Sequence, residues 1–107
     1  MSAEDLRNLV RRYDEEILNR RNYDALTGLV SDGYIDHGAP PGSPAGPVTA
    51  RSGVEAMVAG IPDLRVESGD FVVDGDRVAF RSTISGTQTG PLFGMSSTGN
   101  RVQLTSV

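Results

Sequence analysis

Several residue types are missing from this sequence of 107 residues, and each absence excludes a kind of chemistry. No cysteine is present, which excludes disulfides, thiolate metal sites and a cysteine nucleophile. All ten basic residues are arginine, so no lysine can form a Schiff base or hold a phosphate in a P-loop. The single histidine, His37, excludes a metal site built from several histidines. One imidazole, the carboxylates and three tyrosines remain as the catalytic inventory.

The charge balance and the lack of long apolar runs restrict the partners. There are 14 acidic residues against 10 basic ones, a net charge of −4, which argues against nucleic acid or an anionic membrane. No stretch approaches the ~18 apolar residues of a membrane-spanning helix. The first twenty residues are rich in charged side chains, unlike a signal peptide. We therefore expect a cytoplasmic protein that contacts neither nucleic acid nor membrane.

The length allows a single domain over residues 1–107, and its first part has helical periodicity. Apolar residues recur at helical spacing at Leu6, Leu9, Val10, Tyr13 and Ile17. This stripe predicts an amphipathic helix, and Ser2 with Asp5 forms a capping box at its start. A second, shorter helix is predicted over residues 24–30, and residues 34–37 follow as a short extended segment.

Residues 38–50 hold three glycines and four prolines and no charged residue. Such a composition predicts a long surface loop rather than a helix or a central strand, and ordered loops of this length are often functional lids. Ser52 and Glu55 form a second capping box, which predicts a third helix that begins there and is closed by Pro62.

From Leu64 onward the apolar pattern alternates with a period of two. It predicts strands over residues 64–73, 77–87 and 101–107, with a hairpin turn at residues 74–76 between the first two. In the second strand one face carries Val78, Phe80, Ser82 and Ile84, and the other carries Ala79, Arg81, Thr83 and Ser85. Three helices followed by an antiparallel meander predict an α+β fold with the helices on one face of a curved sheet.

Five segments, in this order, resemble the SnoaL-like polyketide cyclases, also called ester cyclases, of the nuclear-transport-factor-2-like superfamily. They are RRYDEEILNRRNYDAL (11–26), YIDHGAPPGSPAG (34–46), GVEAMVAGIPDLRV (53–66), GDRVAFRSTISGTQTG (75–90) and LFGMSSTGNRVQLTSV (92–107). The resemblance implies a cone-shaped α+β fold, a strongly curved antiparallel sheet wrapped on three helices around a ligand cavity. It also implies acid–base chemistry with no cofactor and no metal, in which an enolate closes a ring by an aldol-type step. The implied partner is a hydrophobic ketone or polyketide-like small molecule.

Other functions stay open, because a fold does not settle an activity. Relatives with the fold that the resemblance implies isomerise ketosteroids, hydrolyse epoxides, dehydrate their substrates or only bind a ligand. One alternative is therefore a non-catalytic module for small-molecule binding or dimerisation. Another is an epoxide hydrolase-type enzyme, which needs paired acidic groups that Asp36 alone does not supply.

The family continues past the last predicted strand with a hairpin that carries the catalytic aspartate of the polyketide cyclases, whereas this sequence stops at Val107. The alternation of the last strand ends without a turn, and such an edge invites pairing. We expect the final strands to belong to a longer version of the protein, or to be supplied by a homodimer or another partner chain. The remaining alternative is a non-catalytic family member.

Three residues are catalytic candidates: Tyr13, Asp36 and His37. An imidazole titrates near neutrality, so His37 suits a general base or an oxyanion donor, with loop anchoring as the alternative. Neighbours on an extended segment point to opposite faces, so we expect only one of Asp36 and His37 to face the cavity. Asp36 is alternatively a turn residue that accepts bonds from the backbone. Tyr13 is either a core aromatic or a donor to a developing enolate oxygen.

Five further residues are candidates for substrate binding: Tyr34, Phe80, Gln88, Phe93 and Met95. The resemblance places Gln88 where relatives carry a polar residue at the pocket mouth; its alternative is an ordinary turn amide. Phe93 and Met95 lie in a glycine-rich loop, which favours lining of a pocket. For Phe80 core packing is the stronger interpretation.

Overall fold

The N-terminal third of the chain is helical in the computed structural model, which describes residues 1–107. Helix α1 (Ala3–Tyr13) starts at the predicted capping box, in which Ser2 and Asp5 exchange two bonds of 3.1 Å. It continues as a π-helical segment, η1 (Asp14–Asn19), which sequence periodicity did not predict. The predicted second helix is a 3₁₀ turn, η2 (Tyr23–Ala25), followed by the short helix α2 (Leu26–Leu29).

Helix α3 (Pro47–Gly60) begins five residues before the predicted start, so the prediction that residues 47–50 are loop is wrong. Proline is well suited to the first helical position, because its missing N–H has no partner there and its φ is already helical. Gly46, with φ of 106°, precedes it. Ser52, predicted as the cap, lies inside the helix and donates from Oγ to the Val48 carbonyl at 2.9 Å. The connecting loop therefore spans residues 38–46.

The C-terminal half forms an antiparallel sheet in the order β1-β2-β3, made of β1 (Arg65–Asp74), β2 (Arg77–Thr87) and β3 (Arg101–Ser106). The predicted hairpin at residues 74–76 is confirmed, with Asp74 paired to Arg77. The register of β1 shifts between Gly69 and Val72, which marks a bulge. The three predicted strands agree with the observed ones to within one residue at each end.

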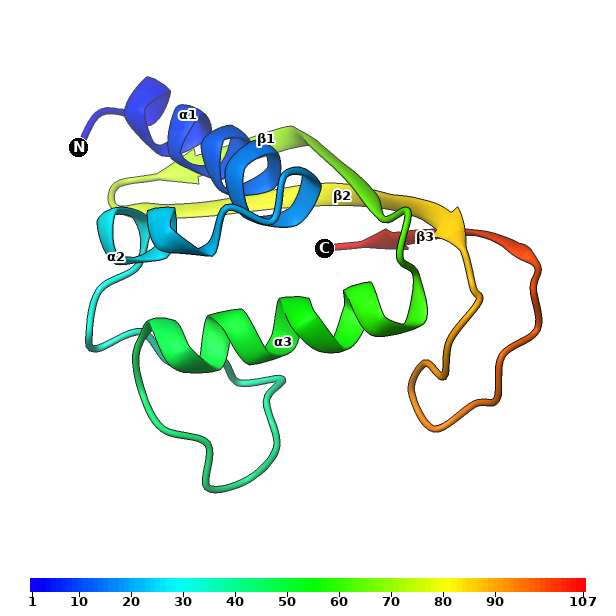
Figure 1. The fold of residues 1–107 in the computed structure, drawn as a ribbon. Coiled ribbons are helices and arrows are strands. Elements are labelled where there is room, and N and C mark those ends of the chain that lie inside the picture. The colour runs from blue at the N-terminus through cyan, green and yellow to red at the C-terminus, as the bar shows by residue number, and fades with distance from the viewer.

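The two faces of the sheet differ in burial, as the alternation predicted. One cross-strand row on the inner face joins Val66, Ile84 and Leu104. On β2, Val78 and Phe80 are half-buried whereas Ala79 and Arg81 are exposed. Figure 1 shows α1 crossing β1 and β2 and α3 running below the sheet in this view. The predicted arrangement of helices on one face of an antiparallel sheet is confirmed.

Two small apolar clusters hold the elements together. The first contains Ile17, Leu26, Val30, Ala50 and Val54. The second contains Ile61, Leu64, Val66 and Leu92. Leu18 and Val58 pack against both clusters and join them. None of the helices is both long and apolar enough to cross a membrane.

Candidate functional site

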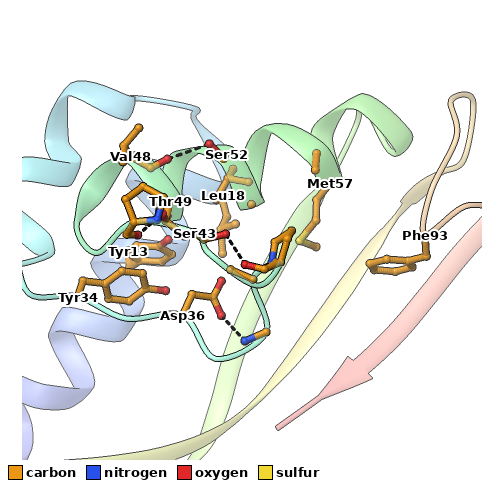
Figure 2. A pocket seen from close by; sticks show the side chains of 18 of the residues that line it. Tyr13, Leu18, Tyr34, Asp36, Ser43, Val48, Thr49, Ser52, Met57 and Phe93 are labelled. Carbon is orange, nitrogen blue, oxygen red and sulfur yellow. Dashed lines mark hydrogen bonds between the residues drawn. The ribbon is translucent and has the colours of Figure 1, made fainter.

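A cavity of about 640 Å³ lies against α3 and is lined by 19 residues, 11 of them hydrophobic. One wall is α3 from Val48 to Met57. The others come from the end of α1, from residues between Tyr34 and Pro44, and from Leu92 with Phe93. Figure 2 shows these segments converging from distant parts of the sequence. The size and the apolar lining are those of a site for a small organic molecule.

Tyr13, Tyr34 and Asp36 gather at one end of the cavity (Figure 2). The backbone N–H of Gly38 donates to Asp36 Oδ1 at 2.8 Å, which fixes the orientation of the carboxylate. The other oxygen, Oδ2, faces α3, because a Cβ built on Gly53 would lie 4.0 Å from it. One carboxylate oxygen is therefore held by the backbone and the second faces the cavity wall.

Burial and neighbouring charge keep the two phenols protonated. Burial raises the pKa of Tyr13 to about 12, and the negative groups nearby, Asp36 among them, act in the same direction. The pKa of Tyr34 is also raised, chiefly by burial and to a smaller extent by the negative charge of Asp36. Both hydroxyls are therefore hydrogen-bond donors at neutral pH and above, and a protonated phenol can stabilise an anionic oxygen that develops in the cavity.

The structure separates the neighbours Asp36 and His37. Along this segment Tyr34 and Asp36 are half-buried and line the cavity, whereas Ile35 and His37 are exposed and do not. This alternation is what an extended backbone produces. Of the two residues, Asp36 is the one that lines the cavity.

Gln88 lies away from the cavity mouth. Its side chain is buried, with the residue 3% exposed, and its amide nitrogen donates to the carbonyls of Gly90 and Ser96, both at 3.3 Å. Its Oε1 accepts from the Thr98 hydroxyl at 2.9 Å. All its polar atoms thus hold the loop between β2 and β3, and the structure corrects the expected position of Gln88.

The aromatic and methionine candidates separate in the same way. Phe93 lines the cavity, but Phe80 and Met95 do not. Phe80 packs against Phe71 across the sheet, with ring centroids 6.1 Å apart, because its strand face meets α1 rather than the cavity. Met95 is 56% exposed, and its backbone pairs with Leu92 across the turn.

The contribution of α3 to the cavity was not predicted from the sequence. Ser52, Gly53 and Ala56 are exposed on the helix and form its wall, with Met57 beside them. Small residues on a helix surface were the available signal, because they leave space where larger side chains would fill it. The apolar residues of that helix indicate only its packing face.

The family model for the SnoaL-like polyketide cyclases matches residues 7–107. The chain therefore belongs to the SnoaL-like polyketide cyclase family, as its sequence motifs indicated. No curated protein matches the chain.

Solved structures support the same fold. The chain is similar to TsrD from Streptomyces laurentii, with a TM-score of 0.86, 23% identity, and coverage of 98% of this chain and 76% of that one. It is also similar to a SnoaL-like polyketide cyclase from Agrobacterium tumefaciens, with a TM-score of 0.78, 29% identity, and coverage of 94% and 75%. IdmH from Streptomyces antibioticus follows, with a TM-score of 0.71, 24% identity, and coverage of 92% and 76%.

Proposed function

We propose that this chain promotes a cofactor-free ring closure or isomerisation of a neutral, hydrophobic ketone of the polyketide type. One observation carries the proposal: Asp36 is oriented by Gly38 in a mainly apolar cavity, beside two phenols that stay protonated. A carboxylate base and hydrogen-bond donors are what enolate chemistry needs.

The proposed reaction starts at the free oxygen of Asp36. Oδ2 removes a proton from a carbon next to a carbonyl, and the electron pair of that C–H bond moves to the carbonyl oxygen. Tyr13 donates a hydrogen bond to the resulting enolate oxygen. The enolate carbon then attacks a second carbonyl of the same molecule and forms the new C–C bond. The alkoxide formed takes the proton back from Asp36, so no atom is lost.

The charges of the cavity define the substrate further. None of its lining residues is arginine or histidine. An anionic substrate would therefore meet the Asp36 carboxylate with no positive group to offset the repulsion. Asp36 is also the only carboxylate among the lining residues, so epoxide opening by paired carboxylates has no support here.

Proton exchange in heavy water tests the base directly. The protein should accelerate exchange of the C1 protons of 2-tetralone, a small neutral ketone, as followed by proton NMR. Asp36→Asn should lower the protein-dependent rate by about 10²–10⁴, the usual contribution of a positioned general base. The asparagine oxygen still accepts the Gly38 N–H, so the melting temperature should be unchanged.

The neighbouring histidine provides the matched control. His37→Gln should leave the exchange rate within a factor of two, because His37 is exposed outside the cavity. Loss of exchange in His37→Gln but not in Asp36→Asn would assign the base to His37 instead. Binding of 2-tetralone with no acceleration by the wild type would favour the non-catalytic binding module.

A further inference from the structure

A tight turn carries Phe93 at the end of the cavity opposite Asp36. Leu92 and Met95 exchange both backbone hydrogen bonds, at 3.0 and 2.9 Å, around the two central residues Phe93 and Gly94. Both central residues have positive φ, 50° and 77°. Such turns favour Gly, Asn or Asp, and a bulky residue at positive φ is an outlier. The chain therefore places a phenylalanine where the backbone disfavours it.

The turn is fixed to the C-terminal end of α3. Leu92 is 7% exposed and packs in the second apolar cluster. The Gly90 N–H donates to the Gly60 carbonyl at 3.1 Å. A Cβ built on Gly60 would lie 2.8 Å from the Pro91 carbonyl oxygen, so backbone meets backbone without space for a side chain. The position of Phe93 is thus set by a buried anchor.

Phe93 also leaves a large apolar surface in water. The residue is 75% exposed although it lines the cavity. Strained backbone is retained where the surrounding structure imposes it, and such positions cluster at ligand-binding sites. An apolar ligand that covered the ring would remove its exposed surface from water, which is favourable in proportion to the area covered.

The cavity is polar at one end and apolar at the other. Figure 2 shows Tyr13, Tyr34 and Asp36 at one side and Met57 with Phe93 at the other. Asp36 Oδ2 faces Gly53, and Met57 lies four residues further along α3, about 6 Å at the helical rise, with Phe93 on the far side of it in Figure 2. A ligand whose ketone lies at Asp36 must extend an apolar portion along α3 to reach Phe93.

We propose that Phe93 is a specificity-determining residue that binds the non-reacting, apolar end of an elongated ketone. This assignment rests on the proposed function only for the position of the ketone at Asp36. If Phe93 binds this end, affinity should depend on the length of the ligand, and substitution of Phe93 should weaken the binding of long ligands only.

A series of three ketones tests this dependence: acetophenone, 2-acetylnaphthalene and 2-acetylanthracene. Their dissociation constants can be measured by equilibrium dialysis on the full chain. Wild-type affinity should rise with ring number. Phe93→Asn should weaken binding of 2-acetylanthracene about tenfold, which is the size of one aromatic contact, and leave acetophenone within twofold. Asparagine tolerates positive φ, so the turn and the melting temperature should be retained.

Met95→Ala is the matched control, because it removes another exposed apolar side chain from the same turn but not from the cavity wall. It should leave all three dissociation constants unchanged. Equal weakening of all three ketones in Phe93→Asn, no weakening at all, or the same loss in Met95→Ala would overturn the proposal. A Phe93-dependent length series without exchange of 2-tetralone would contradict the chemistry of Asp36 and support the role of Phe93.

Discussion

At the scale of single residues, Tyr13 combines a place in the core with a place in the cavity wall, and its donation to an enolate oxygen stays a prediction. It packs against the first apolar cluster and also lines the cavity. The stripe of α1 predicted the packing from local spacing. The second role depends on the loop after α2, which the stripe of α1 does not describe.

The raised pKa of Tyr13 predicts a change in stability at alkaline pH. The unfolded chain loses the phenolic proton near its ordinary pKa of about 10, whereas the folded chain holds it to about 12. The unfolded state therefore binds fewer protons between these values, and the free energy of unfolding should fall as the pH rises through them. Tyr13→Phe should reduce this fall in urea titrations. Without lysine, no ammonium titration obscures the window.

The phenolate absorbance gives an independent check on the same residue. The difference between wild type and Tyr13→Phe should show phenolate formation near pH 12. A transition near pH 10 would show that Tyr13 is not held in a desolvated environment.

At the scale of elements, Asn19 joins the π-helical segment η1 to the sheet. Its Nδ2 donates to the Val66 carbonyl at 3.0 Å, and its Oδ1 accepts the Val66 N–H at 2.7 Å. The side-chain amide thus makes the two hydrogen bonds to Val66 that a neighbouring strand would otherwise make at this edge of the sheet. Local periodicity predicted β1 itself, but it carries no information about a contact between residues 47 positions apart.

Asn19→Ala should lower the free energy of unfolding by about 1–3 kcal/mol, because the buried backbone of Val66 loses its partners. Asn22→Ala is the control, since the exposed side chain of Asn22 bonds only the Glu16 carboxylate, at 3.1 Å, and the substitution should change stability by less than about 0.5 kcal/mol. Chemical denaturation measures both. Equal losses in the two variants would show that the Val66 contact contributes nothing specific.

Elements whose limits depend on distant contacts were the ones predicted incorrectly or not at all. The strands follow their local patterns and were predicted to within about a residue, and α1 starts at its predicted capping box, although the predicted stripe to Ile17 continues into the π-helical segment η1. The turn around Phe93 depends on the close approach of Pro91 to Gly60, and α3 starts where Gly46 lies against the backbone of Asp32. Pro47, in contrast, was a local signal for the start of α3 that the capping motif at Ser52 overrode. The capping motif at Ser52 was a plausible local alternative. In the structure Ser52 lies inside α3, so its hydroxyl donates to the Val48 carbonyl and caps no helix.

At the scale of the whole molecule, the fold was predictable but the cavity was not. The order of helices and strands is local information, and the family motifs cover almost the whole chain. The walls of the cavity come from Tyr13, Asp36, α3 and Phe93, and only the packed chain brings them together. Asp36 and His37 show the limit most clearly, because alternation indicated that they diverge but not which one would face inward.

The two apolar clusters should unfold together, since Leu18 and Val58 pack on both. Val58→Ala removes two methylene equivalents at the junction and should lower the free energy of unfolding by about 1–2 kcal/mol. Tyrosine fluorescence reports the first cluster alone, because all three tyrosines pack there and the chain has no tryptophan. Its transition should coincide with that of far-ultraviolet circular dichroism in wild type and variant. Separate transitions would show that the clusters are independent.

The loop between α2 and α3 is closed at its base, where the Gly46 N–H donates to the Tyr34 carbonyl at 2.8 Å. Loop lengthening beyond such a closure costs little, about 0.6 kcal/mol for each doubling of length. Residues 39–45 can therefore change in length and sequence, and with them the cavity wall that they form, while Gly38 keeps its bond to Asp36 and the Gly46–Tyr34 hydrogen bond holds the start of α3. The hydrogen bond between Gly46 and Tyr34 thus separates α3, whose position must be kept, from a loop segment whose length and sequence can vary.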